Sequence, residues 1–178
     1  TTANNVYYWI DGYRLINRAN LVIEGVSKAI ANGTITKAVG DDYIGQAKFL
    51  RAITHFELLT YFARPYNFTS GASHPGIPYR EVGIDTQNEI DTEILMGRNT
   101  VADCYQKVLT DLTDAETSIT NTTLTKASKK AAIAFKTRVY LHMRDWDKVV
   151  SEGAKIKGTY TLTASPNGPF MDNYLNTE

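Results

Sequence analysis

Three aromatic and two polar side chains stand close together in a part of the sequence without helical periodicity. They are Tyr66, Asn67 and Phe68 and, further along the chain, Tyr79 and Arg80. Aromatic rings stack on the apolar C–H faces of sugars, and amide and guanidinium groups bind hydroxyls; concave binding sites commonly combine such groups. These five residues are our candidate ligand-binding residues. The competing interpretation is that the rings anchor this segment onto neighbouring helices.

The residues that could support catalysis are dispersed. Cys104 falls on an apolar helical stripe, where a free cysteine packs as a small hydrophobe, so we expect a buried, inert thiol. His55, His74 and His142 are far apart and fit no zinc-binding helix motif. Catalysis requires a nucleophile or a general acid–base within hydrogen-bond reach of a partner, and no pair here has such spacing. We therefore expect no enzyme activity, no cofactor and no metal site.

Acidic residues at positions 85, 89, 91 and 93 raise the question of calcium binding. The run lacks the glycine and the twelfth-position glutamate of an EF-hand loop. We expect a solvated loop instead.

Helical periodicity recurs along most of the chain, and almost nothing predicts a strand. We expect helices over about 6–31, 41–64, 101–119, 128–143 and 146–157. The second is apolar around most of its circumference, which is typical of a helix buried between neighbours. Thr100 is the expected N-cap of the third, with Asp103 as a partner resembling a capping box.

Two further expectations concern side chains within these helices. Arg51, Asp111 and Arg138 lie in otherwise apolar stretches, and because buried charges are usually paired, we predict ion pairs or hydrogen bonds for them. Trp9 and Trp146 sit at helical spacing and are predicted core residues.

Between the second and third helices, residues 65–98 form a long ordered loop, a feature that is more often functional than accidental.

Composition narrows the function classes. The chain has 178 residues, with 19 basic and 19 acidic side chains and a formal net charge of zero. Nucleic-acid binding relies on an excess of basic residues, so we expect no nucleic-acid partner. The length predicts one domain. A single cysteine allows no intramolecular disulfide.

The segment over 131–156 resembles a tetratricopeptide (TPR) helix-turn-helix unit. More widely, a series of motifs resembles the SusD/RagB family of outer-membrane glycan-binding lipoproteins. These motifs are, in order, Tyr13-x-x-Ile16-x-x-Ala19-Asn20; Ala47-Lys48-Phe49-Leu50-Arg51-Ala52 with Phe56 and Leu58; Gly76-Ile77-Pro78; Arg98-x-Thr100-Val101 with Tyr105, Val108, Asp111, Leu112 and Ala115; Ala131-Ala132 with Arg138-Val139-Tyr140-Leu141 and Trp146; and Tyr160-x-Leu162. Gln46 departs from the family, which usually has glutamate there.

The resemblance implies an all-α fold of TPR-like antiparallel helix pairs over 1–157, with the loop insertion at about 65–98. Residues 158–178 would begin a truncated C-terminal region or linker. It further implies a surface-exposed lipoprotein of the outer membrane, whose lipid anchor lies outside this chain. Such proteins bind an oligosaccharide without cleaving it and sit on a SusC-like TonB-dependent transporter. The helical portion mainly contacts that transporter and supports the loops.

A different class of function is a generic TPR interaction module that binds a peptide or protein and no sugar. Such a module would hold an extended peptide in a concave groove. A groove filled by the protein's own loop would argue against it.

Overall fold

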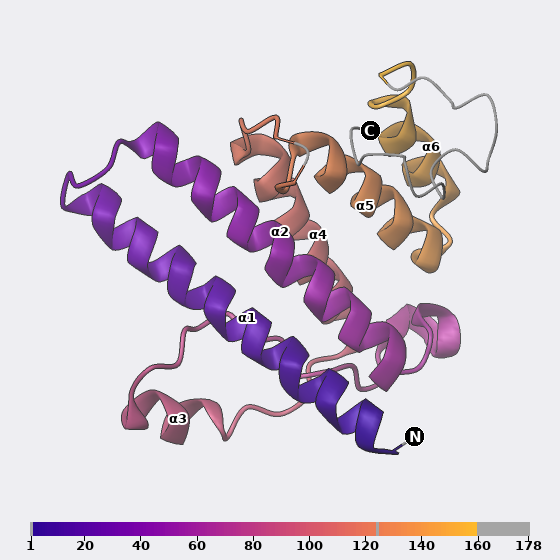
Figure 1. Cartoon of the computed structure of the whole chain (residues 1–178). Coiled ribbons are helices and arrows are strands. Elements are labelled where there is room, and N and C mark those ends of the chain that lie inside the picture. The colour runs from indigo at the N-terminus through magenta and orange to yellow at the C-terminus, as the bar shows by residue number, and fades with distance from the viewer. Residues whose placement is uncertain (1, 124, 160–178) are drawn as a thin grey trace.

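In the computed structural model, the described part of the chain covers residues 2–123 and 125–159, and its regular elements are all helical (Figure 1). The predicted all-α class is confirmed. The five longer helices are α1 (Thr2–Ala31), α2 (Lys37–Phe62), α4 (Val101–Ser118), α5 (Lys129–Met143) and α6 (Trp146–Ala154). No helix in the described residues is both long and apolar enough to cross a membrane.

Helices α1 and α2 form an antiparallel pair joined by a short turn (Figure 1). The turn is closed by Gly33, whose φ of 70° is the left-handed conformation that favours glycine at a helix end. Helix α2 begins earlier than expected because the Thr36 side chain accepts a hydrogen bond from Val39 N and caps it. It ends at Phe62, shortly before Pro65, as the restriction on residues preceding proline predicts.

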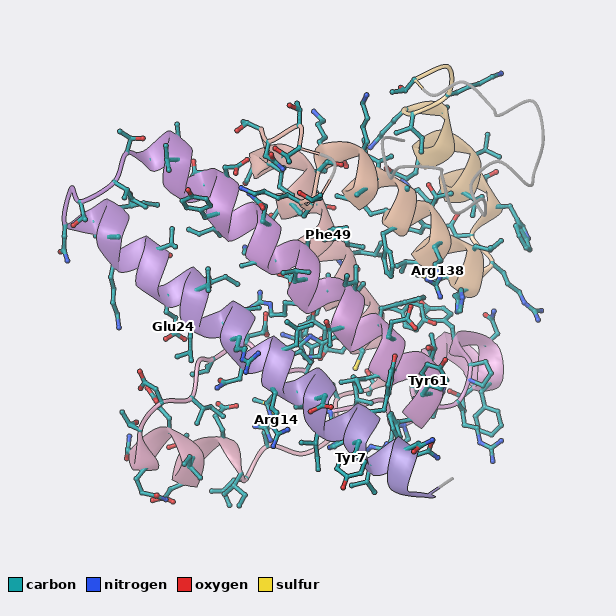
Figure 2. All side chains as sticks on the ribbon, in the orientation of Figure 1. Tyr7, Arg14, Glu24, Phe49, Tyr61 and Arg138 are labelled. Atoms are coloured by element: carbon teal, nitrogen blue, oxygen red, sulfur yellow. The ribbon has the colours of Figure 1, made fainter. Side chains whose placement is uncertain are left out.

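Helix α2 lies at the centre and packs against α1, α4 and α5, as its apolar circumference predicts. Its Phe56 is fully buried and meets the ring edges of Tyr105 on α4 and Phe135 on α5. Phe49 lies on α2 beside α5 and adds a second edge contact with Phe135 (Figure 2). The core therefore joins three helices that are distant in the sequence.

The connection between α2 and α4 is ordered but less irregular than expected. It contains two short 3-10 turns, Tyr66–Phe68 and Ser70–Ala72, and a helix, α3 (Gln87–Glu93). The sequence interpretation missed α3, although Thr86 and Glu89 form a reciprocal capping box at its start. The helix predicted as third is thus α4.

Two details of the remaining helices differ from expectation. Thr100 does cap α4, but the Asp103 carboxylate accepts a hydrogen bond from the Asn99 side chain rather than completing a capping box. Trp146 opens α6 and is 59% exposed, so its predicted core position is wrong. The buried position on α6 belongs to Glu152, which faces a lysine of α5. The Tyr160-x-Leu162 motif and most of the predicted C-terminal linker lie outside the described residues.

Candidate functional site

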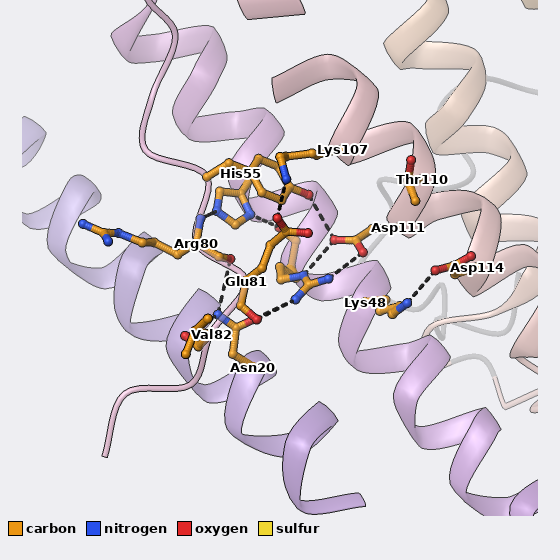
Figure 3. Close-up of polar contacts among 12 residues, drawn as sticks. Asn20, Lys48, His55, Arg80, Glu81, Val82, Lys107, Thr110, Asp111 and Asp114 are labelled. Carbon is orange, nitrogen blue, oxygen red and sulfur yellow. Dashed lines mark hydrogen bonds and ion pairs between the residues drawn. The ribbon is translucent and has the colours of Figure 1, made fainter. Parts of the chain in front are cut away.

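A buried polar network links α1, α2 and α4 (Figure 3). The Arg51 guanidinium makes a two-pronged contact with Asp111: Nε to Oδ2 is 2.8 Å and Nη2 to Oδ1 is 2.7 Å. Both side chains are at most 6% exposed. Arg51 Nη1 also donates to Asn20 Oδ1 at 2.8 Å. The predicted pairing of Arg51 and Asp111 is confirmed.

Two rings extend this network. The Tyr79 hydroxyl donates to Asp111 Oδ2 at 3.0 Å, and its ring stacks on the His55 imidazole with centroids 3.7 Å apart. Arg80 N–H donates to His55 Nε2 at 3.1 Å, and His55 Nδ1 lies 3.0 Å from Arg51 O. Because Nε2 must accept, the proton of the neutral imidazole sits on Nδ1.

The surroundings hold both rings in their neutral forms. Burial lowers the pKa of His55 to about 3, and the positive charges of Arg51 and Lys107 act in the same direction. Burial also raises the pKa of Tyr79 well above its ordinary value, helped by the negative charge of Asp111. Neither group exchanges protons near neutral pH, so the network is suited to holding structure rather than to acid–base chemistry.

Residues 75–84 contain no helix and are here called the strap. They fill the space between α1, α2 and the residues that lead into α4, here called the groove. One face of α1 binds its main chain. Tyr13 Oη donates to Pro78 O at 2.7 Å, and Asn20 Nδ2 donates to Val82 O at 3.0 Å. Asn17 binds both main-chain groups of Ile84, and Glu24 accepts from Gly83 N at 2.7 Å.

The other edge of the strap is held by the residues that lead into α4. Gly76 N donates to Asn99 O at 2.7 Å, and Asn99 N donates to Ile77 O at 3.1 Å. The Asn99 side chain in turn accepts from Tyr79 N at 2.8 Å. The groove therefore holds the strap as a TPR groove would hold an extended peptide, with side chains on both sides binding its main chain.

Sequence reasoning did not identify the residues of α1 that bind the strap. Their signal is the spacing of polar groups at positions 13, 17, 20 and 24, which places them on one face of a helix. Figure 2 shows Glu24 pointing from α1 toward the segment below it. That spacing alone does not identify the partner, because the partner groups are main-chain atoms, which every residue has.

The five predicted ligand-binding residues divide into two groups. Tyr79 is only 1% exposed, and its ring and hydroxyl are both occupied, so a ligand in solvent cannot reach it in this structure. Arg80 pairs with Glu93 of α3, at 2.8 Å from Nη1 to the carboxylate, and also binds the Glu93 carbonyl. These two residues hold the strap and α3.

The other three lie after the end of α2. Tyr66 is half-buried with its ring edge-on to Tyr105, at 4.8 Å between centroids. Asn67 is exposed, and Phe68 is 58% exposed. The Arg64 guanidinium lies 5.3 Å from the Phe68 ring centroid. Of the two groups of candidate residues, this one presents an aromatic ring and an amide to solvent together.

Cys104 is fully buried, and its thiol donates to Ile77 O at 3.4 Å. The expected burial of Cys104 is confirmed, and that burial raises the pKa of its thiol, which favours the protonated form. Arg138 is half-exposed and pairs with Glu57 at 3.1 Å, so it is paired as predicted but not enclosed. Among the described residues, no group of three or more histidines, cysteines and carboxylates is arranged to hold a metal ion.

Comparison with known protein families gives one match. The family model of SusD-like proteins, described as starch-binding associating with the outer membrane, matches residues 1–141. The chain belongs to the SusD-like family. The resemblance drawn from the motifs is confirmed. No curated protein matches the chain.

Solved SusD structures share the fold. A SusD superfamily protein from Bacteroides fragilis is 27% identical, with a TM-score of 0.80 over 98% of this chain and 39% of its own. A SusD superfamily protein from Bacteroides thetaiotaomicron is 25% identical, with a TM-score of 0.75 over 90% of this chain and 34% of its own. A laminarin-binding SusD-like protein is 19% identical with a TM-score of 0.66, which shows the fold alone. The chain thus spans well under half the length of each of the first two.

Proposed function

We propose that this SusD-like chain is the helical scaffold of a protein that captures oligosaccharides at the outer-membrane surface without cleaving them. Membership of a family described as starch-binding and associated with the outer membrane supports glycan capture. We further propose that the whole protein is anchored by lipid and docks on a SusC-like TonB-dependent transporter.

The position of the strap favours this scaffold role over a generic TPR module that binds peptides. A peptide-binding module needs a free groove, whereas Asn17, Asn20 and Glu24 already bind the strap's main chain. Tyr79 fills the groove with a buried ring. A foreign peptide would have to displace both the hydrogen bonds and the stacked ring, which disfavours the peptide-binding alternative.

For glycan contact we propose the Tyr66, Asn67 and Phe68 group. The exposed Phe68 ring offers a face for sugar C–H groups, and the Asn67 amide offers a donor and an acceptor for hydroxyls. Tyr66 supports the group by packing against Tyr105. Tyr79 and Arg80 keep a supporting role in this proposal.

The test is oligosaccharide binding by the whole protein that carries this chain. Starch, laminarin and xylogluco-oligosaccharides form the panel, since the family and two structural relatives are described with them. Phe68→Ala should weaken binding of the preferred glycan by about tenfold, as for a contact residue at the centre of a site. Tyr7→Ala, at an exposed tyrosine of α1, is the control. Unchanged affinity for the Phe68 variant would remove it from the site, and release of reducing sugar would contradict a non-catalytic role.

For docking we propose the outer groove between α1 and α2. Apolar side chains that line it stay 38–47% exposed, among them Leu15, Val22, Tyr43 and Leu50. Exposed contiguous apolar surface is typical of protein contacts. Leu50→Glu should abolish co-purification of a transporter identified by mass spectrometry as TonB-dependent. Leu141→Glu, at a leucine on α5 that is slightly more exposed than Leu50, should leave it unchanged; equal loss in both variants would contradict this assignment.

A further inference from the structure

A cavity of about 300 Å³ lies between α1, the strap and α3. Trp9 and Tyr13 supply an aromatic wall from α1, with ring centroids 4.7 Å apart. Ile90 of α3 and Ile94, directly after the end of α3, line it on the opposite side. The volume is at the lower end for ligand pockets, and an apolar cavity of about half that size holds benzene.

Helix α3 does not close this cavity by packing. Ile90 is 45% exposed and Ile94 is 73% exposed, although both line the cavity. Hydrogen bonds from Arg80 to the carbonyl and carboxylate of Glu93 tie α3 to the strap. The apolar face of α3 is therefore held near the aromatic wall of α1 with space left between them.

The hydrogen-bonding capacity of the cavity is small. Asn17 and Asn20 line it, but their amides are committed to the strap and to Arg51. Arg80 uses Nη1 for both bonds to Glu93, and within residues 2–123 and 125–159 its Nε and Nη2 make no side-chain hydrogen bond that would occupy them. One hydroxyl could accept from this guanidinium and donate to the Glu93 carboxylate.

We propose that this cavity binds a small aromatic ring carrying a hydroxyl group, that is, a ligand of the phenol class. The ring would lie between the Trp9–Tyr13 wall and the two isoleucines, Ile90 and Ile94, and its hydroxyl would meet the Arg80–Glu93 pair. An aromatic carboxylate would bring a second negative charge beside Glu93. A sugar would leave several hydroxyls unpaired against apolar walls, which is costly. This site is separate from the proposed glycan contact at Phe68.

Trp9 provides the signal for a test with phenol itself. In the Trp146→Phe variant of the chain, Trp9 is the remaining tryptophan, and Trp146 is exposed and remote from the cavity lining. Phenol should change the Trp9 emission saturably. Benzoate should bind at least about tenfold more weakly, and glucose should give no response. No saturable response to phenol, or an equal response to all three probes, would overturn the proposal.

Ile94 and Leu95, which follow the end of α3, give a matched comparison. In the same background, Ile94→Phe adds bulk at the cavity lining and should weaken phenol binding by about tenfold or more, the scale on which apolar pockets discriminate shape. Leu95 is 83% exposed and does not line the cavity, so Leu95→Phe should bind like the parent. Ile94→Ala and Leu95→Ala repeat the comparison without added bulk, and circular dichroism verifies folding. Equal effects at positions 94 and 95 would contradict the proposal.

Discussion

The His55 imidazole lies flat against the Tyr79 ring, with centroids 3.7 Å apart and planes inclined by 12°. One ring comes from the central helix α2 and the other from the strap, so this contact fixes the strap in the groove. His55 also accepts the Arg80 N–H, which a protonated imidazole could not do. The stability of the strap is thereby coupled to the neutral state of a single histidine.

Stability should consequently fall as the solution becomes acidic. The pKa of His55 is lowered by burial to about 3 in the folded chain and is about 6.5 when unfolded. Between these values the unfolded chain binds a proton that the folded chain does not, so the free energy of unfolding decreases as pH falls. Each pKa unit corresponds to about 1.4 kcal/mol. Urea unfolding between pH 7 and about 5, above the range of ordinary carboxylates, measures the slope.

Variants identify the histidine responsible. His55→Gln should flatten this slope, although the variant is less stable at pH 7. Burial also lowers the pKa of His142, but that residue is exposed, so His142→Gln should remove a smaller part. A slope that survives in His55→Gln would show that the histidine does not govern the acid response.

The Arg51–Asp111 pair should be far more important for stability than a surface pair. Asp111→Asn keeps the shape of the side chain but leaves the Arg51 charge buried without its partner. Breaking such a pair costs about 3–5 kcal/mol. The control is Asp114→Asn, which breaks the more exposed contact with Lys48 and should cost about 0–1 kcal/mol. Equal shifts in urea midpoint would mean that the buried network contributes no special stability.

The sequence predicts the local part of this structure well and the non-local part poorly. Helical periodicity and the cap at Thr100 depend on near neighbours in the chain, and both expectations hold. The strap is different, because its partners on α1 bind main-chain atoms more than 50 residues away. Nothing in a local pattern could show that the Tyr79 ring would be buried. Arg51, Asp111 and Arg138 are an intermediate case. The sequence predicts that these charged side chains are paired, but it does not predict the geometry of the pairs.

A second buried cation fixes the C-terminal helices. Lys136 of α5 is almost fully buried and contacts carboxylates of Glu116 on α4 and Glu152 on α6. Lys136→Met would leave two acidic groups close together without their central charge, and should cost about 3 kcal/mol or more. Lys155 contacts the same two carboxylates but is 41% exposed, so Lys155→Met should cost about 0–1 kcal/mol. Thermal unfolding of the two variants measures these costs. Similar losses of stability in both would show that burial of Lys136 is unimportant.

Phe56 and Trp146 test how burial decides the contribution of an aromatic side chain to stability. Phe56 is fully enclosed between α4 and α5, so Phe56→Ala removes apolar contacts and leaves a void, costing about 3–5 kcal/mol. Trp146 is the larger residue, yet its ring is mostly in solvent, and Trp146→Ala should change the free energy of unfolding by no more than about 0.5 kcal/mol. Urea titration of both variants measures the difference. A large loss at Trp146 would mean that its ring is buried in solution, as its spacing in the sequence first predicted.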